Sequence, residues 1–486
     1  MKTNSLDFDA QALREKILDL AMRGKLVKQD PNDESASVLL EKIKAEKAEL
    51  VKEKKIKKSK PLPEITDDEK PFDIPDSWEW VRLGWIGTLK NGKTPKKEDI
   101  SDQGSYPYFK VKDMNNNQVY MNNIENFVNE KYINQLMPKD TIIFPKNGGA
   151  VLTAKKRILI QDSLVDLNTG GIIPNSNISF KYLFYLFRNL NIKDYVKGSA
   201  VPTIDSKKLR ETVVPLPPLE EQSRIAAKIA QLFALLRKVE SSAQQYAKLQ
   251  TLLKSKVLDL AMRGKLVKQD PNDEPASVLL EKIKAEKEQL IKEKKIKKSK
   301  PLPPISDEEK PFDIPDSWEW VRLGEILKPE SHKKPSIDFT YIDIASVDNK
   351  INKVIAPTKI VIGKDKVASR ARQILDKNDI LFSVVRPYLK NIAMVPDTKQ
   401  LQIGSTGFYV LKPFKLINRQ YIFYLVLSNY VIQSMTKKMK GDNSPSIRKG
   451  DLQNFIVPLP SLPEQSRIVN KITQLFFLLS EEKSST

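Results

Sequence analysis

One segment of the chain matches a phosphate-binding pattern without error. Gly87-Thr-Leu-Lys-Asn-Gly92-Lys93-Thr94 fits G-x-x-x-x-G-K-[ST], where glycine-rich backbone N–H groups cradle phosphates between a strand and a helix. Pro95 follows at once, and the charged run 96–99 offers no apolar helix face. The match therefore indicates a basic turn, and nucleotide binding stays open only as the weakest of three functional interpretations.

Other residue types restrict the chemistry further. The chain has no cysteine and one histidine, His332, in the run Ser331-His-Lys-Lys334. A metal site of His and Cys ligands is thereby excluded, and a nucleophile–histidine triad would depend on one surface residue. We predict a non-enzyme without a catalytic, metal or cofactor site. The residues from Met1 do not resemble a signal peptide, and no apolar run could span a membrane, so we expect a cytoplasmic protein.

The net charge of +21 is unevenly placed. Segment 79–214 carries 20 Lys and Arg against 13 Asp and Glu, and segment 319–457 carries 23 against 12. These two segments hold +18 of the total, so the rest of the chain is nearly balanced. Excess Lys and Arg neutralise phosphates and release counterions, which makes nucleic acid the first partner to consider.

The elements that must position this charge are repeated. Residues 18–84 recur as 258–324 with seven substitutions, and 215–225 recur in similar form as 458–468. The segments between the repeats, about 85–195 and 325–435, are almost unalike. The chain therefore holds two different inserts in one repeated frame.

Within the frame, apolar residues recur at alternating spacings of four and three, which is a coiled-coil seam. Pro217 and Pro218 suit a helix start and Gly264 a stop, so we predict one helix over 219–263, about 65 Å long at 1.5 Å per residue. The seam residues are Ile225, Ile229, Leu232, Leu236, Val239, Ala243 and Tyr246.

The twin of this helix is split between the chain ends, 458–486 and 1–24. In the repeat register Thr486 corresponds to Ala243 and Met1 to Ser241. We expect the termini to meet and two long helices to pair antiparallel with cyclic pseudo-twofold symmetry. Shorter helices are expected at 35–56 and 275–296. The lysine runs after them, 52–60 and 292–300, are predicted to be solvated helix ends rather than nucleic-acid patches.

This repeat architecture resembles, over the whole chain, the specificity subunit of type I restriction-modification enzymes. Frame motifs that carry the resemblance are Arg23–Asp33 with Leu39–Ile43, Ile74–Leu83 with Ile314–Leu323, and Val214–Pro217 with Val457–Pro460. Insert motifs are Gly92–Pro95, Tyr106–Met114, and Asp379–Ser383 continuing to Arg386-Pro387. Each short motif is weak evidence on its own, and the repeat architecture is the specific evidence for the resemblance.

The resemblance implies an α+β fold with two globular target recognition domains separated by two long antiparallel helices. Each domain would read one half of a split double-stranded DNA target, with the helices as the ruler for the unread spacer. Two methylation subunits and two restriction or motor subunits would bind the chain. S-adenosylmethionine, ATP and magnesium would belong to those partners. Because the inserts differ, we predict unlike half-sites. The expected segments are frame 1–77, first domain 78–214, frame 215–313, second domain 314–457 and closing helix 458–486.

Candidate DNA contacts follow from charge and position within the inserts, since phosphate contacts set register and a few Arg, Asn or Gln contacts read bases. The candidates are Lys93, Lys96, Lys97, Lys110, Lys112, Lys146, Asn147, Lys155, Lys156, Arg157, Lys197, Lys333, Lys334, Arg370, Arg372, Arg386, Lys390 and Lys440. Lys197 and Lys440 flank the aligned motifs Gly198-x-x-x-Pro202 and Gly441-x-x-x-Pro445. For any one lysine, a solvated surface charge is the competing interpretation.

Two other classes remain open. A basic coiled-coil scaffold without DNA specificity predicts charge spread over the frame, which the counts above disfavour. A nucleotide-using enzyme depends on Gly87–Thr94 alone.

Overall fold

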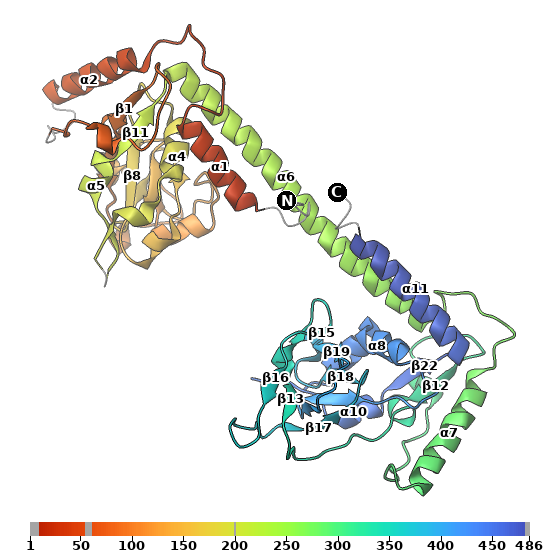
Figure 1. Cartoon of the computed structure of the whole chain (residues 1–486). Helices are drawn as coiled ribbons and strands as arrows, with labels where there is room; N and C mark the ends of the chain where they lie inside the picture. Colours follow the sequence, from red (N-terminus) through yellow and green to blue (C-terminus); the bar gives the residue numbers. More distant parts are fainter. Residues whose placement is uncertain (1–8, 54–60, 199–200, 482–486) are drawn as a thin grey trace. The chain divides into compact units, whose positions relative to one another are not determined.

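The computed structural model of the chain describes residues 9–53, 61–198 and 201–481 (Figure 1). Two compact units divide it, Asp7–Ser242 and a unit formed mainly by Ala243–Thr486, which we term the first and second unit. Helix α6 (Leu219–Met262) gives its first half to the first unit and its second half to the second.

The first unit is built on an antiparallel sheet in the order β2–β8–β5–β6 and a smaller sheet in the order β4–β3–β7. Helix α4 packs on the larger sheet, where the rings of Phe187 and Phe144 lie 5.1 Å apart between centroids. The strands are β1 (Glu79–Arg82), β2 (Gly87–Asn91), β3 (Tyr106–Phe109), β4 (Phe127–Val128), β5 (Ile142–Pro145), β6 (Arg157–Ile158), β7 (Leu164–Val165), β8 (Thr169–Pro174), β9 (Val196–Lys197), β10 (Thr203–Ile204) and β11 (Val213–Leu216). The helices are α1 (Ala10–Met22), α2 (Ala36–Lys52), α3 (Leu83–Ile86), α4 (Phe180–Asn189) and α5 (Ser206–Glu211).

The second unit carries two larger sheets, β16–β13–β20–β17 and β14–β15–β19–β18–β21, and helix α8 packs on the latter. Its strands are β12 (Glu319–Arg322), β13 (Phe339–Ile342), β14 (Val347–Asp348), β15 (Lys353–Val354), β16 (Thr358–Ile360), β17 (Ala371–Leu375), β18 (Ile380–Ser383), β19 (Ile392–Met394), β20 (Gln402–Ser405), β21 (Phe408–Leu411) and β22 (Ile456–Leu459). Its helices are α7 (Ala276–Lys292), α8 (Arg419–Leu427), α9 (Asn429–Lys437), α10 (Lys449–Gln453) and α11 (Leu462–Glu481).

The repeated frame folds identically in both units. A two-stranded ribbon closes each insert, with Val81 opposite Val214 in β1–β11 and Val321 opposite Val457 in β12–β22. The indole N–H of Trp78 donates to Glu221 (2.9 Å), and that of Trp318 donates to Glu464 (2.8 Å). Burial raises the pKa of both carboxyls. A buried charged carboxyl is costly unless it accepts hydrogen bonds, and each indole N–H supplies one.

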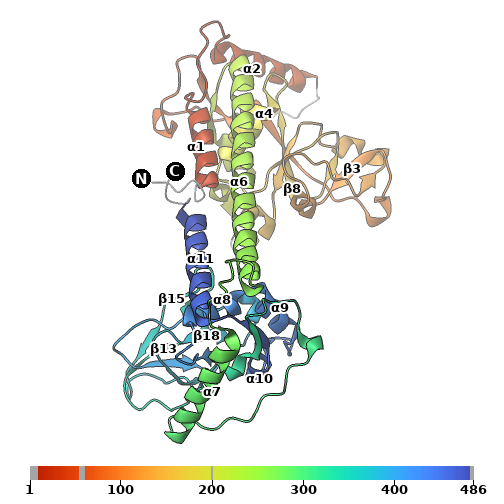
Figure 2. The same cartoon turned by 90° about the vertical axis from the view of Figure 1, so that its right-hand side faces the viewer.

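Each unit pairs its part of α6 with a second helix, α1 in the first unit and α11 in the second, as both views show (Figures 1 and 2). Arg14 of α1 forms an ion pair with Glu240, while Gln29 beyond the end of α1 bonds to Glu221, so α1 and α6 run antiparallel. In the second unit the amide of Gln250 donates to the Leu479 carbonyl (2.7 Å), and Gln269 bonds to Glu464. Seam residues Ile225 and Ile229 are buried, as a seam requires.

The structure agrees with the predicted fold class, because each unit is α+β and helix α6 pairs antiparallel with α1 in the first unit and with α11 in the second. The observed helix Leu219–Met262 matches the predicted 219–263, and Ala36–Lys52 and Ala276–Lys292 end four residues short of the predicted helices 35–56 and 275–296. The expected meeting of the chain ends falls on residues 1–8 and 482–486, outside the described residues, as does most of the lysine run 52–60. The run at 292–300 is largely exposed.

Candidate nucleic-acid interface

A loop cluster gathers the basic residues of the first insert around residues 166–168. The N–H of Lys93 donates to the Val165 carbonyl (2.8 Å), and Lys146 donates to Asn168 (2.7 Å). The side-chain amide of Asn147 donates to Leu167 (3.1 Å). These bonds bring three loops that are far apart in sequence, around residues 93, 146–147 and 165–168, to one surface. We call the loops 92–94, 110–112, 146–155, 166–168 and 196–204 the first loop cluster, of which 199–200 are outside the described residues.

Asp166 is a buried residue whose carboxylate holds parts of this cluster together. Its carboxylate accepts the N–H of Val111 (3.1 Å) and the hydroxyl of Thr169 (2.7 Å). Burial and the nearby Asp166 charge raise the pKa of Tyr108 to about 12, so that phenol stays neutral. A buried carboxylate that accepts such bonds fixes the loops above it.

The second insert forms an equivalent second loop cluster from loops 331–334, 370–373, 384–390, 405–407 and 440–447. Lys333 N–H donates to the Arg372 carbonyl (2.8 Å), and Thr406 N–H donates to that of Arg370 (2.9 Å). Gln373 has the same role here, because its buried amide donates to the carbonyls of Ser405 (2.6 Å) and Phe408 (2.9 Å).

Three backbone hydrogen bonds recur in both clusters although the insert sequences are unlike. Gly148 donates to Pro202 in the first (2.8 Å), as Arg386 donates to Pro445 in the second (2.9 Å). Ile204 donates to Lys146 (2.9 Å) and Ile447 to Val384 (2.9 Å). The N–H of Lys146 donates to Asn168 in the loop before β8, and the N–H of Val384 donates to Gly407 in the loop before β21. The two inserts therefore share one surface construction.

Most predicted contact residues face the solvent. Exposed ones are Lys93, Lys96, Lys97, Lys112, Lys197, Lys333, Lys334, Arg370, Arg386 and Lys440; half-buried ones are Lys110, Lys146, Asn147, Lys155, Arg157, Arg372 and Lys390. Lys96 and Lys97 lie beside Asp99 and Tyr132 rather than on the first loop cluster, since the N–H of Lys96 bonds to the Tyr132 hydroxyl (3.2 Å).

Lys156 requires a correction. Its side chain is 6 % exposed, and its ammonium donates to the carbonyls of Phe187 and Leu190 (2.8 Å to the latter) at the end of α4. Burial lowers the pKa of Lys156 to about 7. The last carbonyls of a helix lack intrahelical partners, so this side chain caps a helix inside the fold and is not a surface contact.

Arg157 and Lys390 are also engaged within their units. The Arg157 guanidinium donates to the carbonyls of Asn117 (2.7 Å) and Met114 (3.0 Å). Lys390 Nζ lies 3.3 Å from Asn429 Oδ1, and burial lowers its pKa. Both side chains have less freedom to reach a phosphate than the exposed lysines.

Several surface residues were missed because only polar residues were chosen. Leu152, Leu167 and Val201 are 52 %, 52 % and 61 % exposed within the first loop cluster. Tyr388 and Leu389 are 46 % and 39 % exposed in the second. Only Tyr388 and Leu389, which lie between the predicted residues Arg386 and Lys390, had a signal in the sequence. Exposed apolar side chains gathered on one surface mark a binding site.

The segment 87–94 is not a phosphate loop in the structure. Gly87–Asn91 is strand β2, and the first helical element after it is the three-residue turn Lys97–Asp99. The N–H groups of Gly92 and Lys93 are used by the carbonyls of Thr169 and Val165. No group of three or more His, Cys, Asp or Glu that could hold a metal occurs in the part of the chain that the structure describes. None of the described helices is both long and apolar enough to cross a membrane.

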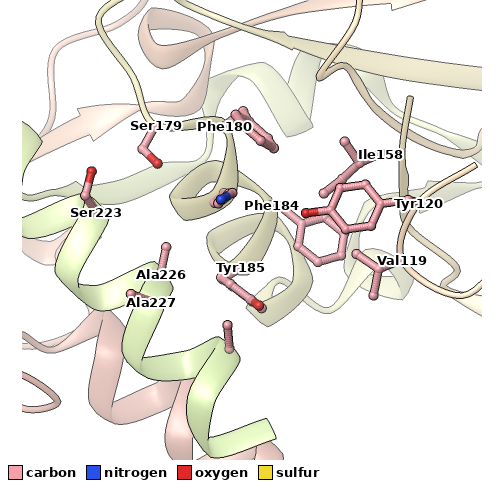
Figure 3. A pocket seen from close by; sticks show the side chains of 12 residues that line it. Val119, Tyr120, Ile158, Ser179, Phe180, Phe184, Tyr185, Ser223, Ala226 and Ala227 are labelled. Atoms are coloured by element: carbon pink, nitrogen blue, oxygen red, sulfur yellow. The ribbon is translucent and has the colours of Figure 1, made fainter. Parts of the chain in front are cut away.

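A pocket of about 380 Å³ lies in the first unit, apart from the residues that form the loop cluster (Figure 3). Phe184 and Tyr185 of α4 and Ala226 and Ala227 of α6 are among the residues that line it (Figure 3). In the second unit Thr473, which stands where the first has Ala230, lies 3.2 Å from the Tyr424 hydroxyl. At the positions that correspond to Ala226 and Ala227, α11 has the larger residues Val469 and Asn470.

Comparison with known proteins gives one consistent result. The family model "Type I restriction modification DNA specificity domain" matches residues 75–249 and 315–485. The type I restriction enzyme EcoAI specificity subunit of Escherichia coli is 33 % identical, with 96 % of this chain and 89 % of the relative covered. The MjaVIII specificity subunit of Methanocaldococcus jannaschii is 26 % identical over 83 % of this chain and 87 % of the relative.

Solved structures show the same fold. One, described as "Structural basis underlying complex assembly and conformational transition of the type I R-M system", is 21 % identical with a TM-score of 0.56, covering 85 % of this chain and 93 % of that one. The HsdS subunit of Thermoanaerobacter tengcongensis is 19 % identical with a TM-score of 0.50, at the same coverages.

Proposed function

Because this chain belongs to the family of type I restriction-modification specificity subunits, we propose that each loop cluster contacts one half of a split double-stranded DNA target. The chain carries two DNA target recognition domains. The observation that supports the proposal is the recurrence of one hydrogen-bonded, basic loop surface in two inserts of unlike sequence. Two surfaces with the same construction and different side chains suit two readers of unlike half-sites.

The proposed chemistry separates positioning from reading. Exposed lysines such as Lys93 and Lys197 in the first loop cluster, and Lys333 and Lys440 in the second, would hold phosphates and set register. Residues at the cluster centres would reach base edges in the major groove, where all four base pairs differ.

We further propose that the chain is non-catalytic and acts in the cytoplasm. Methylation subunits and restriction or motor subunits, expected as two of each, would bind the repeated frame. S-adenosylmethionine, ATP and magnesium would be held by those subunits. Support comes from the names of the relatives and from the repetition of the frame, whose Trp–Glu hydrogen bond occurs in both units.

A modified-base map tests the function. The chain is co-expressed with its methylation subunit in a host without DNA methylation, and the DNA is sequenced for N6-methyladenine. One split motif with unlike halves and a fixed gap is expected. A well-formed complex that adds no methylation would contradict the proposal and favour the scaffold interpretation.

A salt titration tests the phosphate contacts. Lys93→Ala in the complex should reduce the slope of log affinity against log salt by about 0.9 for the one phosphate lost. Lys139→Ala is the matched control, since Lys139 is an exposed lysine of the same unit outside the first loop cluster. Equal slope changes in both variants would mean that the cluster has no special role.

A further inference from the structure

Unusual backbone conformations concentrate at two turns. Among the described residues, seven non-glycine positions have positive φ. Three are Asp or Asn, which tolerate this region. The other four are Ala154, Lys294, Arg386 and Lys390, and three of them bound short 3-10 turns in the loop clusters. Such outliers carry a conformational cost that surrounding structure must offset, and they gather at functional sites.

The two turns have the same plan. In the first unit the 3-10 turn Gly149–Thr153 lies between Gly148 (φ 77°) and Ala154 (φ 52°). In the second unit Pro387–Leu389 lies between Arg386 (φ 48°) and Lys390 (φ 53°). Each turn is tied down at its start by the bond from Gly148 or Arg386 to the proline carbonyl of the neighbouring loop.

The second turn is held from its other side as well. The amide of Asn349 donates to the Leu389 carbonyl (2.7 Å), and that of Asn352 donates to Lys390 (3.0 Å). Pro387 is buried as the anchor, while Tyr388 and Leu389 remain 46 % and 39 % exposed. Several hydrogen bonds therefore fix a turn that holds the side chains of Tyr388 and Leu389 towards the solvent.

Arg386 is preorganised on the same turn. Its side chain is exposed, and one terminal nitrogen donates to the Asn443 carbonyl (2.8 Å). Among the described residues the Arg386 guanidinium makes this one hydrogen bond, so its other N–H groups are available to a ligand. A planar fork with free N–H groups matches the O6 and N7 acceptors of guanine as well as a phosphate, and the exposed neighbours Tyr388 and Leu389 favour a base as its partner.

We propose that the turn Arg386–Lys390 is the base-reading element of the second recognition domain, with Arg386 donating to a guanine and Tyr388 and Leu389 contacting apolar base edges. The turn Gly148–Ala154 is the corresponding element of the first domain and reads through Leu152, because Gly148 has no side chain to offer. The inference rests on the proposed function and names the residues within it that discriminate sequence. A turn that only held phosphate would gain nothing from exposed Tyr388 and Leu389.

The experiment uses the complex of the full chain with its methylation subunit and compares Arg386→Lys, Arg386→Gly and wild type by N6-methyladenine mapping. Arg386→Lys keeps the charge and the backbone cost but removes the fork. Arg386→Gly removes the side chain at a φ that glycine adopts freely. Arg419→Lys is the matched control, because Arg419 also gives one bond to a backbone carbonyl, that of Lys377 (2.7 Å), away from the cluster.

Both Arg386 variants should lose discrimination at one G·C position of one half-site by roughly tenfold to a hundredfold, the range of a bidentate base contact. Discrimination at the other half-site should be unchanged. The Arg386→Lys variant should also keep the wild-type affinity for unrelated duplex DNA and the wild-type thermal midpoint. Leu152→Ala should relax only the other half-site, with Ile133→Ala, 54 % exposed outside the cluster, as its control.

Three results would overturn the inference. If the complex with Arg386→Lys methylates the wild-type motif with full discrimination, the Arg386 side chain contacts a phosphate and not a base. Equal loss on target and unrelated DNA in Arg386→Gly would lead to the same conclusion. Loss of discrimination in both half-sites would place the effect on assembly. Because wild type must first give a split motif, failure of the proposed function is seen separately.

Discussion

The ammonium of Lys156 closes the end of α4, while its neighbour Lys155 lies at the surface beside Asn115. Two adjacent lysines of the same sequence motif thus have opposite roles. The difference comes from strand β6, which begins at Arg157 and fixes which side of the backbone faces α4.

Lys156→Met should therefore destabilise the first unit by about 1–3 kcal/mol, because buried carbonyls at the end of α4 lose their donor. Chemical denaturation of the complex would measure the change. Lys155→Met is the control and should change stability little. Weaker DNA binding by Lys156→Met at unchanged stability would show that the cap assignment is wrong.

A second residue-scale feature is the ion pair of Arg82 with Glu69, in which Arg82 also donates to three backbone carbonyls. The bonds from Arg82 lower the pKa of Glu69 from 4.5 to about 2. A carboxyl whose folded-state pKa is depressed stabilises the fold above its unfolded value and loses that contribution as pH falls.

We therefore expect the wild-type protein to lose stability between about pH 4.5 and pH 2 more steeply than Glu69→Gln does. Denaturation midpoints at pH 6, 4 and 3 would measure the difference. Glu309→Gln, in the twin pair with Arg322, is a replicate within the same chain. Parallel pH profiles for Glu69→Gln and wild type would contradict the assignment.

At the scale of the elements, the ends of α1 and α6 are fixed by close approach to a proline. Gly24 and Gly264 have φ of 68° and 66°, the left-handed region that suits a residue just past a helix end. A Cβ at Gly24 would meet Pro75 Cγ at 2.4 Å, and one at Gly264 would meet Pro315 at 2.3 Å. The repeated frame keeps both contacts, so the exit direction of each helix is set in the same way.

Gly24→Ala and Gly264→Ala should each destabilise their own unit by more than about 1 kcal/mol, since both strain and a clash are added. Hydrogen exchange in α1 for the first variant and in the second half of α6 for the other would locate the effect. Gly363→Ala is the control, because its φ of 86° is also positive while its Cβ would meet nothing within 4 Å. An equal loss in all three variants would show that φ alone, not the contact, is responsible.

At the scale of the whole molecule, the sequence repeat predicts that the two chain ends are interchangeable with a break in α6. Met1 corresponds to Ser241 and Thr486 to Ala243, so residues 1–3 repeat positions that 484–486 already supply, and joining Thr486 to Asn4 would restore an uninterrupted twin of segment 215–264. Opening the chain between Ser241 and Ser242 would then move the break from one twin to the other. The frame around the recognition domains would be unchanged.

A chain that runs from 242 to 486 and on from 4 to 241 should therefore fold and direct methylation to the same split motif. The base map of its complex would check this. A permutation opened between Ile225 and Ala226, within the buried part of α6, should fail and is the control. Loss of the motif in the first permutation, with the complex intact, would refute the cyclic arrangement.

The sequence alone was sufficient for the frame. The spacing of Ile225, Ile229 and Leu232 predicts a helix, because a helix repeats every 3.6 residues and this local property is visible in the order of apolar residues. Because segment 69–84 recurs unchanged as 309–324, the sequence predicts equivalent surroundings for Trp78 and Trp318. Charge counts in the inserts pointed to the partner class, since counterion release depends on composition.

Only the tertiary structure brought the candidate site together. The bonds that join residues 93, 146, 167 and 202 run mainly through backbone groups, which every residue type possesses and no spacing reveals. Which lysine turns inward depends on what packs beneath it, as Lys156 and α4 show. The turn that contains Arg386 with its positive φ is held by hydrogen bonds to loops some 40 to 60 residues away in sequence, and long-range constraints of that kind leave no local signature.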